Sequence, residues 1–514
     1  MSEQLYQLIA LVAYMVILLW IGWYSYKRTS NLNDFMLGGR SLGPGVTALS
    51  AGAADMSGWL LMGLPGAVYL YGAGELWMGV GLLLGAYFNW LLVAPRLRAY
   101  TEVNDSITVP RYLENRLNDH SKVLRMMTAV IILVFFTFYV SSGMVAGGKF
   151  FESSFGLDYH VGLIVVAVVV LLYTLFGGFL AVSYTDFFQG LIMFLALIIV
   201  PVMSIYYLGG WSSVKDIVLS VNPNHFNWLK DVEVGSTLYN YLTSIDSVTT
   251  LTGIGIFSLV GWGLGYFGQP HVIVRFMAIS SIEEVKSARR IGMGWMFISL
   301  IGASLTAFAG LAYFSNNGGI DAIDAETVFI VMGQIVFHPL IAGVVLAAVL
   351  AAIMSTVASQ LIVTPSALVE DVYKAVTKKE KSDRYYVLLG RVAVLIVTLV
   401  ALALAWPNSQ SILSLVGFAW SGFGGAFGPI ILLSLYWRRL TAKGAIYGMV
   451  VGAVVAFVWP SLESLGGWFT IYGIIPAFFA NLLVTILVSK KTYKKDEAIE
   501  KDFDAAMDLL KKHQ

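Results

Sequence analysis

The chain has 514 residues, of which 58% are hydrophobic and only 12% are charged. A soluble globular protein has roughly 45–50% apolar and about 25% charged residues, so this composition excludes an ordinary soluble enzyme. The net charge is only +1 and there are no cysteines, which excludes recruitment of nucleic acid by an overall field, disulfide bonds and thiolate metal sites.

Apolar runs of about 20 residues recur along nearly the whole chain, and each can cross a hydrocarbon core about 30 Å thick as a helix. The first run follows Met1–Gln4, which carries no basic residue, and precedes Lys27 and Arg28, so we expect a retained span and not a cleaved signal peptide. We therefore predict an all-α polytopic membrane protein with about thirteen transmembrane helices. The predicted spans are 5–26, 44–71, 75–95, 126–148, 160–182, 187–208, 251–274, 291–314, 336–373, 392–406, 411–437, 444–460 and 468–489.

Basic residues gather in one of the two alternating sets of loops between these spans. Of the 32 Lys and Arg residues, 29 lie in loops 27–43, 96–125, 183–186, 275–290, 374–391 and 438–443 and in the tail after Ser489. The other set holds only Lys149, Lys215 and Lys230. The positive-inside tendency then predicts an outside N-terminus and a cytoplasmic C-terminus. No Lys or Arg lies deep within a predicted span.

Two spans contain helix-breaking residues in corresponding positions of two five-span blocks. Their breakers are Gly52, Gly58, Gly63, Pro65 and Gly66 in span 44–71, and Gly261, Gly263, Gly265, Gly268 and Pro270 in span 251–274. Glycine costs about 1 kcal/mol and proline about 3 in a helix interior. Paired, interrupted helices indicate a transporter's midplane binding site, and a repeat of five spans must be inverted. The alternative is that the glycines only permit close packing, as we expect for Gly81/Gly85 and Gly444/Gly448/Gly452.

Asp55 lies near mid-depth in the first interrupted span, where an acidic side chain costs roughly 2.5–3.5 kcal/mol. A cation is the natural partner, and unwound carbonyls around Ala53 and Met56 would add the oxygen ligands that a hard ion needs. The alternatives are a helix cap or a contact with a buried arginine. In span nine, Ser355 and Thr356 could complete such an ion site, although hydroxyls in a helix usually bond back to its own carbonyls.

Other motifs carry less chemical information. Trp262 and Tyr266 share a helix face at i, i+4 beside the expected break. The sequence Gly263-x-Gly265-x-x-Gly268 lacks the strand and soluble helix of a dinucleotide site, so we reject that reading. The six histidines have no metal-ligand spacing, and His271 is expected to be a solvated helix-end residue. No enzyme motif is present.

Three polar segments complete the predicted organisation. The segment from Gly209 to Thr249 is expected to form a long outside loop. A short cytoplasmic helix is expected to start near Pro110. The tail from Asp496 to Lys512 has apolar residues at helical spacing and predicts a solvated or surface-lying helix.

Five motifs resemble one known family. They are LGGRSLGP (37–44), ALSAGAADMSGWLLMGLPGAV (48–68), GWGLGYFGQPH (261–271), LAAIMSTVASQL (350–361) and AWSGFGGAFGP (419–429). In this order they resemble the sodium/solute symporter family and, within it, the carriers of proline. The resemblance implies a five-plus-five inverted-repeat core with broken helices, of the amino-acid-transporter (LeuT-like) type, and alternating access. The expected division is 1–43 (peripheral helix and loop), 44–208 (first repeat), 209–250 (outer loop), 251–437 (second repeat), 438–489 (two peripheral helices) and 490–514 (tail).

The resemblance also implies functional residues. It assigns a sodium site to Ala53, Asp55, Met56, Ala352, Ser355 and Thr356, and a substrate site to Ser57, Gly58, Tyr139, Trp262, Tyr266 and Pro270. It further implicates Arg40 and Asp186, nearer the cytoplasmic side. The chain departs from the expected pattern at Ala54, at Tyr184 and at Thr364-Pro365. Of these, Pro365 is expected to alter the bend of span nine, and with it ion affinity rather than ion identity.

The match in the second interrupted span favours proline as the substrate. We therefore expect sodium-coupled import of L-proline across a bacterial plasma membrane, with Na⁺ as the coupling ion, no organic cofactor and no nucleic-acid partner. The alternatives are a symporter of this family for pantothenate, a sugar or choline, or a substrate sensor or channel on the same scaffold.

Overall fold

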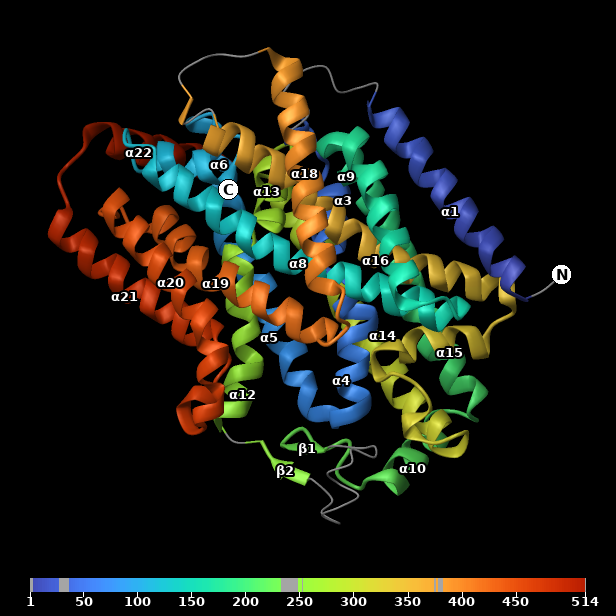
Figure 1. Ribbon diagram of the computed structural model, residues 1–514. Helices are drawn as coiled ribbons and strands as arrows, with labels where there is room; N and C mark the ends of the chain where they lie inside the picture. The colour runs from blue at the N-terminus through green and yellow to red at the C-terminus, as the bar shows by residue number, and fades with distance from the viewer. Residues whose placement is uncertain are drawn as a thin grey trace.

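The computed structural model describes residues 3–26, 37–232, 248–251, 253–373, 376–377 and 382–513. Parts of the predicted loops around 27–43, 209–250 and 374–391 therefore lie outside the described residues. Within them, ten helical ranges are long and apolar enough to cross a membrane, and one, Pro44–Val103, holds two helices that meet at Gly72. Shorter apolar helices include Tyr159–Leu172 and Gly253–Gly268. The predicted polytopic helical bundle is confirmed (Figure 1).

The first half of the chain contains α1 (Glu3–Tyr26), η1 (Gly38–Arg40), α3 (Pro44–Gly58), η2 (Trp59–Gly63), α4 (Leu64–Tyr71), η3 (Gly72–Glu75), α5 (Leu76–Phe88), η4 (Asn89–Val93), α6 (Ala94–Val103), α7 (Val109–Arg116), α8 (Val123–Phe155), α9 (Tyr159–Tyr207), α10 (Trp211–Val221), β1 (Lys230–Val232) and β2 (Val248–Thr250). The second half contains α12 (Gly253–Val260), η5 (Gly261–Gly268), α13 (Pro270–Ala278), α14 (Glu284–Asn316), η6 (Ile320–Ala322), η7 (Ala325–Thr327), α15 (Val328–Val336), α16 (Pro339–Pro365), η8 (Ser366–Tyr373), α18 (Asp383–Ala405), α19 (Ile412–Tyr436), α20 (Ala442–Leu462), η9 (Glu463–Leu465), η10 (Gly467–Thr470), α21 (Ile474–Thr492) and α22 (Glu497–Lys512).

Both predicted interruptions are present. In the first, Ser57 leaves the helical region (φ 35°, ψ −165°), a π-helical turn follows, and α4 begins with a proline in its first turn. In the second, α12 gives way to the 3-10 helix η5, Gln269 is extended (φ −79°, ψ 107°), and Pro270 begins α13. Proline suits these restarts because the first turn of a helix needs no intrahelical N–H donor.

The glycines of the second interrupted span also permit close helix packing. Helix interruption and close packing therefore both apply to them. A Cβ at Gly263 would overlap the carbonyl oxygen of Gly81 of α5, and one at Gly85 of α5 would overlap the carbonyl oxygen of Gly263. In the peripheral pair α20 and α21, a Cβ at Gly448 would overlap the hydroxyl of Thr485, as the small-residue pattern predicted.

Some predicted boundaries are wrong. The loop predicted at 183–186 is helical, and the turn between spans five and six lies at Gly178 (φ 66°, ψ 174°). Hydropathy misplaced it because Thr185 satisfies its hydroxyl within the helix, on the carbonyl of Ala181 at 2.9 Å. The third span also extends to Val103, and α15 is a separate helix before the ninth span.

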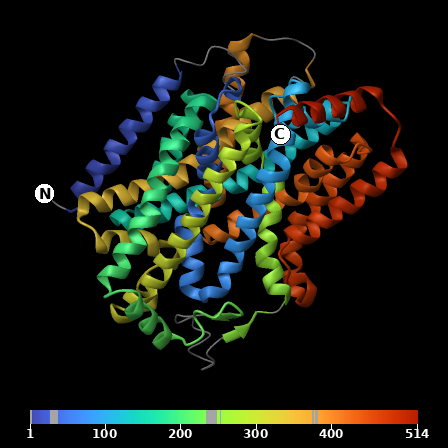
Figure 2. The same ribbon diagram turned by 180° about the vertical axis from the view of Figure 1, so that it is seen from behind.

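The N-terminal helix α1 packs against α16 and α9 at the edge of the bundle, as Figures 1 and 2 show. Its inward face buries Leu11, Tyr14 and Leu18. The crossing is close, because a Cβ at Gly343 of α16 would lie 2.7 Å from the Cβ of Ala10. The first span is thus held against both α16 and α9.

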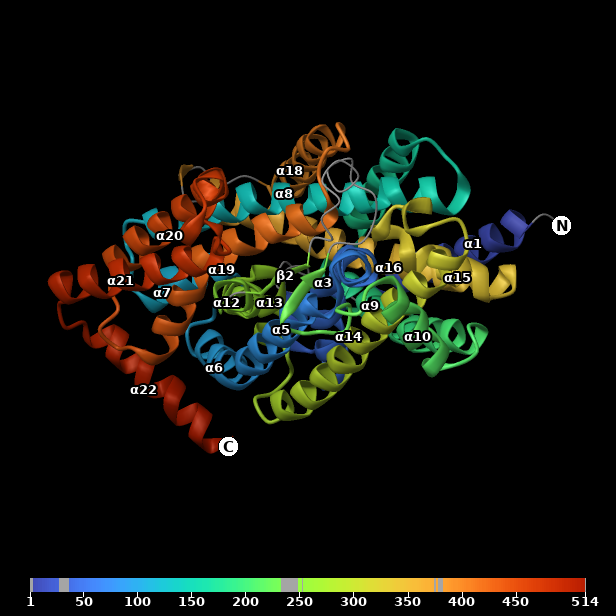
Figure 3. The same cartoon turned by 90° about the horizontal axis from the view of Figure 1, so that it is seen from below.

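The polar segments form structure at both ends of the bundle. The predicted helix near Pro110 is α7, and the predicted tail helix is α22, which buries Phe503, Ala506 and Leu510. Figure 3 shows α22 at the periphery beside α6. At the opposite end, α10 packs against α14, and the antiparallel pair of β1 and β2 lies under α4 and α5 (Figure 1).

Candidate ion and substrate site

Asp55 lies two residues before Ser57, where α3 is interrupted, and is 2% exposed. Its carboxylate accepts a hydrogen bond from the hydroxyl of Tyr266 in η5, and its backbone carbonyl accepts one from the hydroxyl of Tyr139 in α8 at 3.3 Å. The second carboxylate oxygen has no hydrogen-bond partner among the described residues. Both interrupted helices therefore meet at one buried acid whose hydrogen-bonding capacity is only partly used.

Neutral oxygen atoms from α3 and α16 gather beside it. Ser355 Oγ donates to the carbonyl of Ala53 at 2.8 Å, and Thr356 Oγ1 lies 3.3 Å from the same carbonyl. Thr356 Oγ1 also accepts from the backbone N–H of Ser57 at 3.0 Å. All of these residues are buried. The carboxylate of Asp55 bonds to Tyr266 and not to these hydroxyls.

The two remaining residues of the expected sodium site are engaged locally. The carbonyl of Met56 accepts from the backbone N–H of Trp59, and the carbonyl of Ala352 lies 3.2 Å from Ser355 Oγ. The structure thus brings the expected set together on two facing helices, and its neutral oxygens are the ligand type that a hard cation prefers.

The prediction that Trp262 and Tyr266 share a helix face is wrong. Trp262 stacks on Tyr472, with ring centroids 4.9 Å apart, whereas Tyr266 meets Trp420 edge-on at 5.0 Å. The reason is that η5 is a 3-10 helix with three residues per turn, so positions i and i+4 do not share a face. Pro270 lines a different cavity.

Gly58 is also among the expected substrate residues, and it lies where α3 and α8 approach each other closely. A Cβ at Gly58 would lie 2.8 Å from the Cβ of Ala146 in α8. The cavities near the site are small: one of about 20 Å³ is lined by Asp55 and Tyr266, and one of about 30 Å³ is lined by Pro270. Each has room for about one or two waters, so a larger solute requires the surrounding helices to separate.

Asp186 lies in a second buried cluster, which contains an arginine that was not predicted there from the sequence. It receives hydrogen bonds from Arg275 Nη2 (3.1 Å), Ser50 Oγ (2.9 Å) and Ser359 Oγ (3.2 Å), and all four side chains are fully buried. Arg275 lies in the last turn of α13, at the end of the second interrupted segment. Arg275 neutralises Asp186 and not Asp55, so Asp55 keeps its need for another cation.

His271 is also buried, which contradicts the expectation of a solvated helix end. Neither ring nitrogen has a hydrogen-bond partner among the described residues. The ring packs edge-on against Phe136 and Tyr139, with centroids 5.6 Å away in both cases. The 3-10 geometry of η5 places the start of α13 inside the bundle.

Arg40 lies at the end of the bundle that carries α22. It adopts positive φ (53°) and donates to the carbonyls of Thr101, Ser106 and Met277 at 2.5, 2.9 and 3.0 Å. Burial lowers the pKa of Arg40 to about 10. Arg40 therefore ties η1 to α6 and to the end of α13, a positioning role beside the second interrupted helix.

Sequence reasoning missed Asn89, which lines the same small cavity as Asp55 and is 1% exposed. Its side-chain oxygen has no partner among the described residues, and it begins the π-helical turn η4. An amide in the middle of an apolar span was the available signal. For Arg275, the available signal was a basic residue directly after the second interrupted span.

Comparisons with known proteins agree with this architecture. A sequence model of the sodium:solute symporter family matches residues 35–452. The chain is 53% identical over 494 residues to the high-affinity proline transporter PutP of Bacillus subtilis (strain 168), covering 96% of this chain and all of that protein. It is 49% identical over 512 residues to the sodium/proline symporter of Staphylococcus aureus (strain JH9), covering 98% and 96%.

Two solved structures share the fold. One is a sodium-coupled sialic acid symporter in a substrate-bound outward-open state, with a TM-score of 0.77, 17% identity and coverage of 96% of this chain and 99% of the other. The second is Mhp1, a nucleobase-cation-symport-1 family transporter in a closed conformation, with a TM-score of 0.51, 14% identity and coverage of 93% and 100%. The predicted inverted-repeat, LeuT-like fold is confirmed. The chain belongs to the sodium:solute symporter family, and it is a transporter rather than an enzyme.

Proposed function

We propose that this chain imports L-proline by sodium-coupled symport with alternating access. The named relatives at 53% and 49% identity support proline as the substrate. The observation that carries the proposal is the meeting of the two interrupted helices at Asp55, through its hydrogen bond with Tyr266. One solute site and one ion site can then share the same movable segments.

Sodium is proposed to bind between α3 and α16. Its ligands are the carbonyls of Ala53, Met56 and Ala352 and the hydroxyls of Ser355 and Thr356, while Asp55 supplies the nearby negative charge. The bond between Thr356 Oγ1 and the N–H of Ser57 supports direct coupling, because it joins an ion ligand to the break in the substrate helix at 3.0 Å.

Proline is proposed to bind where α3, α8 and η5 converge. The break at Ser57 and Gly58 offers backbone groups for the carboxylate of the zwitterion. Tyr139, Trp262 and Tyr266 supply aromatic surface for the ring, and Pro270 lines the separate cavity on the side of α7. We assign Arg40 and Asp186 to the closure of that side, because both tie α13 to neighbouring helices.

The proposed topology places the N-terminus outside and the C-terminus in the cytoplasm of a bacterial cell. We assign 44–208 and 251–437 to the two inverted repeats, 209–250 to the outer loop, and 1–43, 438–489 and 490–514 to peripheral parts. The concentration of Lys and Arg at the end that carries α22 supports this assignment.

One coupled sodium supplies enough free energy for accumulation. Entry down a potential of about 100 mV gives about 2.3 kcal/mol, and a tenfold sodium gradient adds about 1.4. The total of about 3.7 kcal/mol supports roughly 500-fold accumulation of a neutral zwitterion.

Uptake into proteoliposomes tests the proposal. Radiolabelled proline is offered under inward gradients of sodium, potassium or protons, alongside pantothenate, glucose and choline. Proline uptake that requires sodium, with lithium as the closest substitute, is the expected result. Preference for another solute would reassign the substrate, flux without an ion gradient requirement would indicate a channel, and binding without flux would indicate a sensor.

A further inference from the structure

A hollow lies where α22 crosses the bundle, far from Asp55. It is lined by Arg96 of α6, by Tyr436, Arg438 and Arg439 at the end of α19, and by Phe503 and Met507 of α22. It continues into a second cavity that shares Arg96, Tyr436, Arg438 and Met507 with it. The two parts measure about 510 and 410 Å³. This hollow, called the arginine hollow below, is far larger than the cavities at the ion site.

The arginine hollow has an excess of positive charge. The acids that border it are paired: Asp504 forms an ion pair with Arg438, and Asp508 lies 3.6 Å from Lys511. Arg96 donates to the carbonyl of Leu435 (3.0 Å) and to the sulfur of Met507 (3.2 Å), and its guanidinium lies 3.9 Å from the ring centroid of Tyr436; none of these contacts brings a negative charge to it.

Arg439 is the second uncompensated cation. Its guanidinium lies 5.7 Å from the ring of Tyr493, it is exposed, and among the described residues it has no carboxylate partner. Two guanidinium groups in one hollow suit a phosphate group, which accepts several charge-assisted hydrogen bonds.

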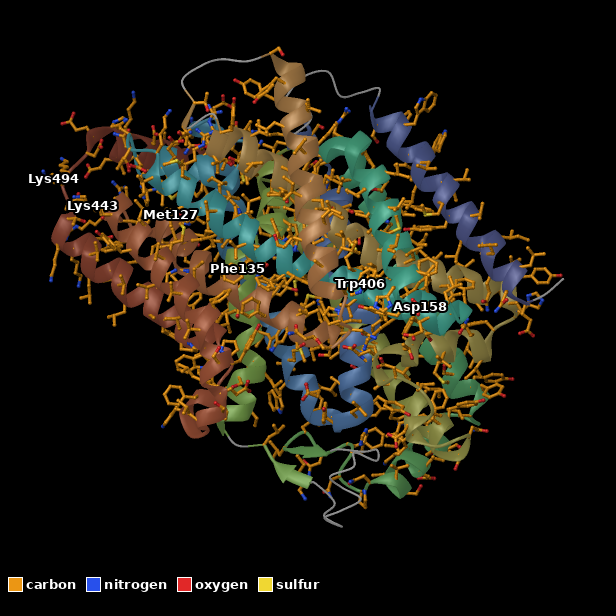
Figure 4. All side chains as sticks on the ribbon, viewed as in Figure 1. Met127, Phe135, Asp158, Trp406, Lys443 and Lys494 are labelled. Atoms are coloured by element: carbon orange, nitrogen blue, oxygen red, sulfur yellow. The ribbon has the colours of Figure 1, made fainter. Side chains whose placement is uncertain are left out.

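The surface next to the hollow is apolar. Leu91, which lines the second cavity, is 38% exposed, and Phe88 and Tyr87 on the preceding turn of the same helix are 44% and 41% exposed. In Figure 4, Lys443 and Lys494 lie at the same edge of the molecule. An anionic group beside an exposed apolar stripe matches a phospholipid better than a free anion, because the acyl chains can follow the stripe.

We propose that the arginine hollow binds the headgroup of an anionic phospholipid, with its phosphate between Arg96 and Arg439 and its acyl chains along the exposed face of α5 and η4. The amphipathic helix α22 forms one wall, since Phe503 and Met507 line the first part of the hollow and Met507 and Leu510 line the second. Basic pockets at the membrane surface are known to recognise such headgroups. The lipid would hold α22 against the bundle.

The test uses the full-length protein in neutral detergent with an equimolar mixture of phosphatidylglycerol and phosphatidylcholine. Native mass spectrometry measures the retained lipid. We expect the wild-type chain to retain phosphatidylglycerol preferentially, and Arg439→Gln or Arg96→Gln to lower that preference by about fivefold each. Arg439 is exposed, so its variant remains informative even where Arg96→Gln impairs folding. Trp437 also lines the hollow, so brominated phosphatidylglycerol should quench a component of the fluorescence that Trp437→Phe removes.

Arg290→Gln is the matched control, because Arg290 is an exposed arginine of α14 outside the hollow. It should leave the preference unchanged. Equal retention of the two lipids, or an equal loss in Arg290→Gln, would overturn the proposal in favour of a diffuse surface field. Displacement of phosphatidylglycerol by millimolar inorganic phosphate would also overturn it, because the hollow would then take a free anion.

Discussion

Asp55 is the residue on which ion coupling is expected to depend. It is buried, one of its oxygens accepts a hydrogen bond from Tyr266, and the buried Arg275 pairs with Asp186 instead. A carboxylate at mid-depth costs roughly 2.5–3.5 kcal/mol on insertion scales. A cation that arrives and leaves with each cycle offsets this cost only while it is bound.

Asp55→Asn should nearly abolish sodium-driven uptake. The amide keeps the shape but removes the charge, so the variant should insert and fold at least as well as the wild-type chain. Uptake in proteoliposomes at graded sodium concentrations measures the first effect, and thermal unfolding in detergent measures the second. Unchanged sodium dependence would make Asp55 a structural residue.

Removing one hydroxyl ligand should weaken ion binding without abolishing transport. Ser355→Ala and Thr356→Ala each delete one oxygen, and Thr356→Ala also removes the acceptor of the Ser57 N–H. The sodium concentration for half-maximal uptake should rise about tenfold or more, because a hydrogen bond or ligand contact to a charged group contributes about 1.5–3 kcal/mol. Thr356→Ser should be milder. Equal effects of alanine and serine at 356 would assign the change to packing.

The aromatic residues should separate into two roles. Trp262→Ala should raise the KM for proline at least about tenfold, or about 1.4 kcal/mol, while sodium binding survives. Tyr266→Phe keeps the ring but removes the hydroxyl that bonds to Asp55, so we expect its main effect on sodium dependence. Direct binding of both ligands to the purified variants decides the matter. Normal proline affinity in a folded Trp262→Ala protein would remove that residue from the site.

At the scale of elements, hydropathy and the positions of glycine and proline were sufficient to predict most spans and both interrupted helices. They could not predict the type of helix at the second interruption. Because η5 winds as a 3-10 helix, it turns Trp262 and Tyr266 toward different neighbours and carries His271 and Arg275 into the interior. Helix type depends on contacts with α5 and α19, which lie far away in sequence.

The residues of the candidate site could likewise be predicted only in part. The resemblance predicted the residues of α3 and α16 that the structure brings together, because a motif carries its own spacing. It did not indicate Asn89, Trp420 or Tyr472, which contribute through tertiary contact with the interrupted helices. The order of residues along one segment could be predicted, whereas the partners supplied by other segments could not.

The segment between α10 and β1 is expected to be held by a pH-sensitive contact. His225 is fully buried, its ring bonds to the carbonyl of Val68 at 3.2 Å, and its own carbonyl accepts the N–H of Ala73 at 2.8 Å. Burial lowers the pKa of His225 to about 4 from 6.5. The released segment therefore binds a proton more readily, and docking is fully stable above pH 6.5 and weakens as the pH falls toward 4.

Hydrogen exchange of residues 211–230 measures this effect. Exchange rates at pH 5 and pH 7 are first corrected for the intrinsic rates. The increase in exchange rate from pH 7 to pH 5 should then be larger for the wild-type segment than for the same segment of His225→Gln. Parallel behaviour of the two proteins would show that the segment is held by other contacts.

At the scale of the whole molecule, one side of the site is closed by charged contacts among three segments. Asp371 of η8 accepts a hydrogen bond from Arg125 of α8 at 2.7 Å, and Arg125 also contacts Glu114 of α7 at 3.1 Å. Asp371 lines the same cavity of about 30 Å³ as Pro270 and Ile362. Opening toward this end therefore requires the contacts of Arg125 to separate.

Arg125→Gln should favour opening at this end. The chain has no cysteine, so Ile362→Cys gives a single reporter without further engineering. Ile362 is 6% exposed, and its labelling by a membrane-impermeant maleimide should be several times faster in the Arg125→Gln background. The control is Ile362→Cys with Arg290→Gln, which should label as slowly as Ile362→Cys alone. Equal rates in all three proteins would contradict the assignment.

The close crossing of α1 and α16 at Gly343 has a consequence for biogenesis. Synthesis at 5–20 residues per second separates the completion of α1 from the start of α16 by roughly 15–60 seconds. During that interval the face of α1 that carries Leu11, Tyr14 and Leu18 has no partner from α16. Until α16 is made, α9 is the earlier helix that can cover part of that face, and a bulky side chain at 343 would leave an inserted chain whose first helix lacks its contact with α16.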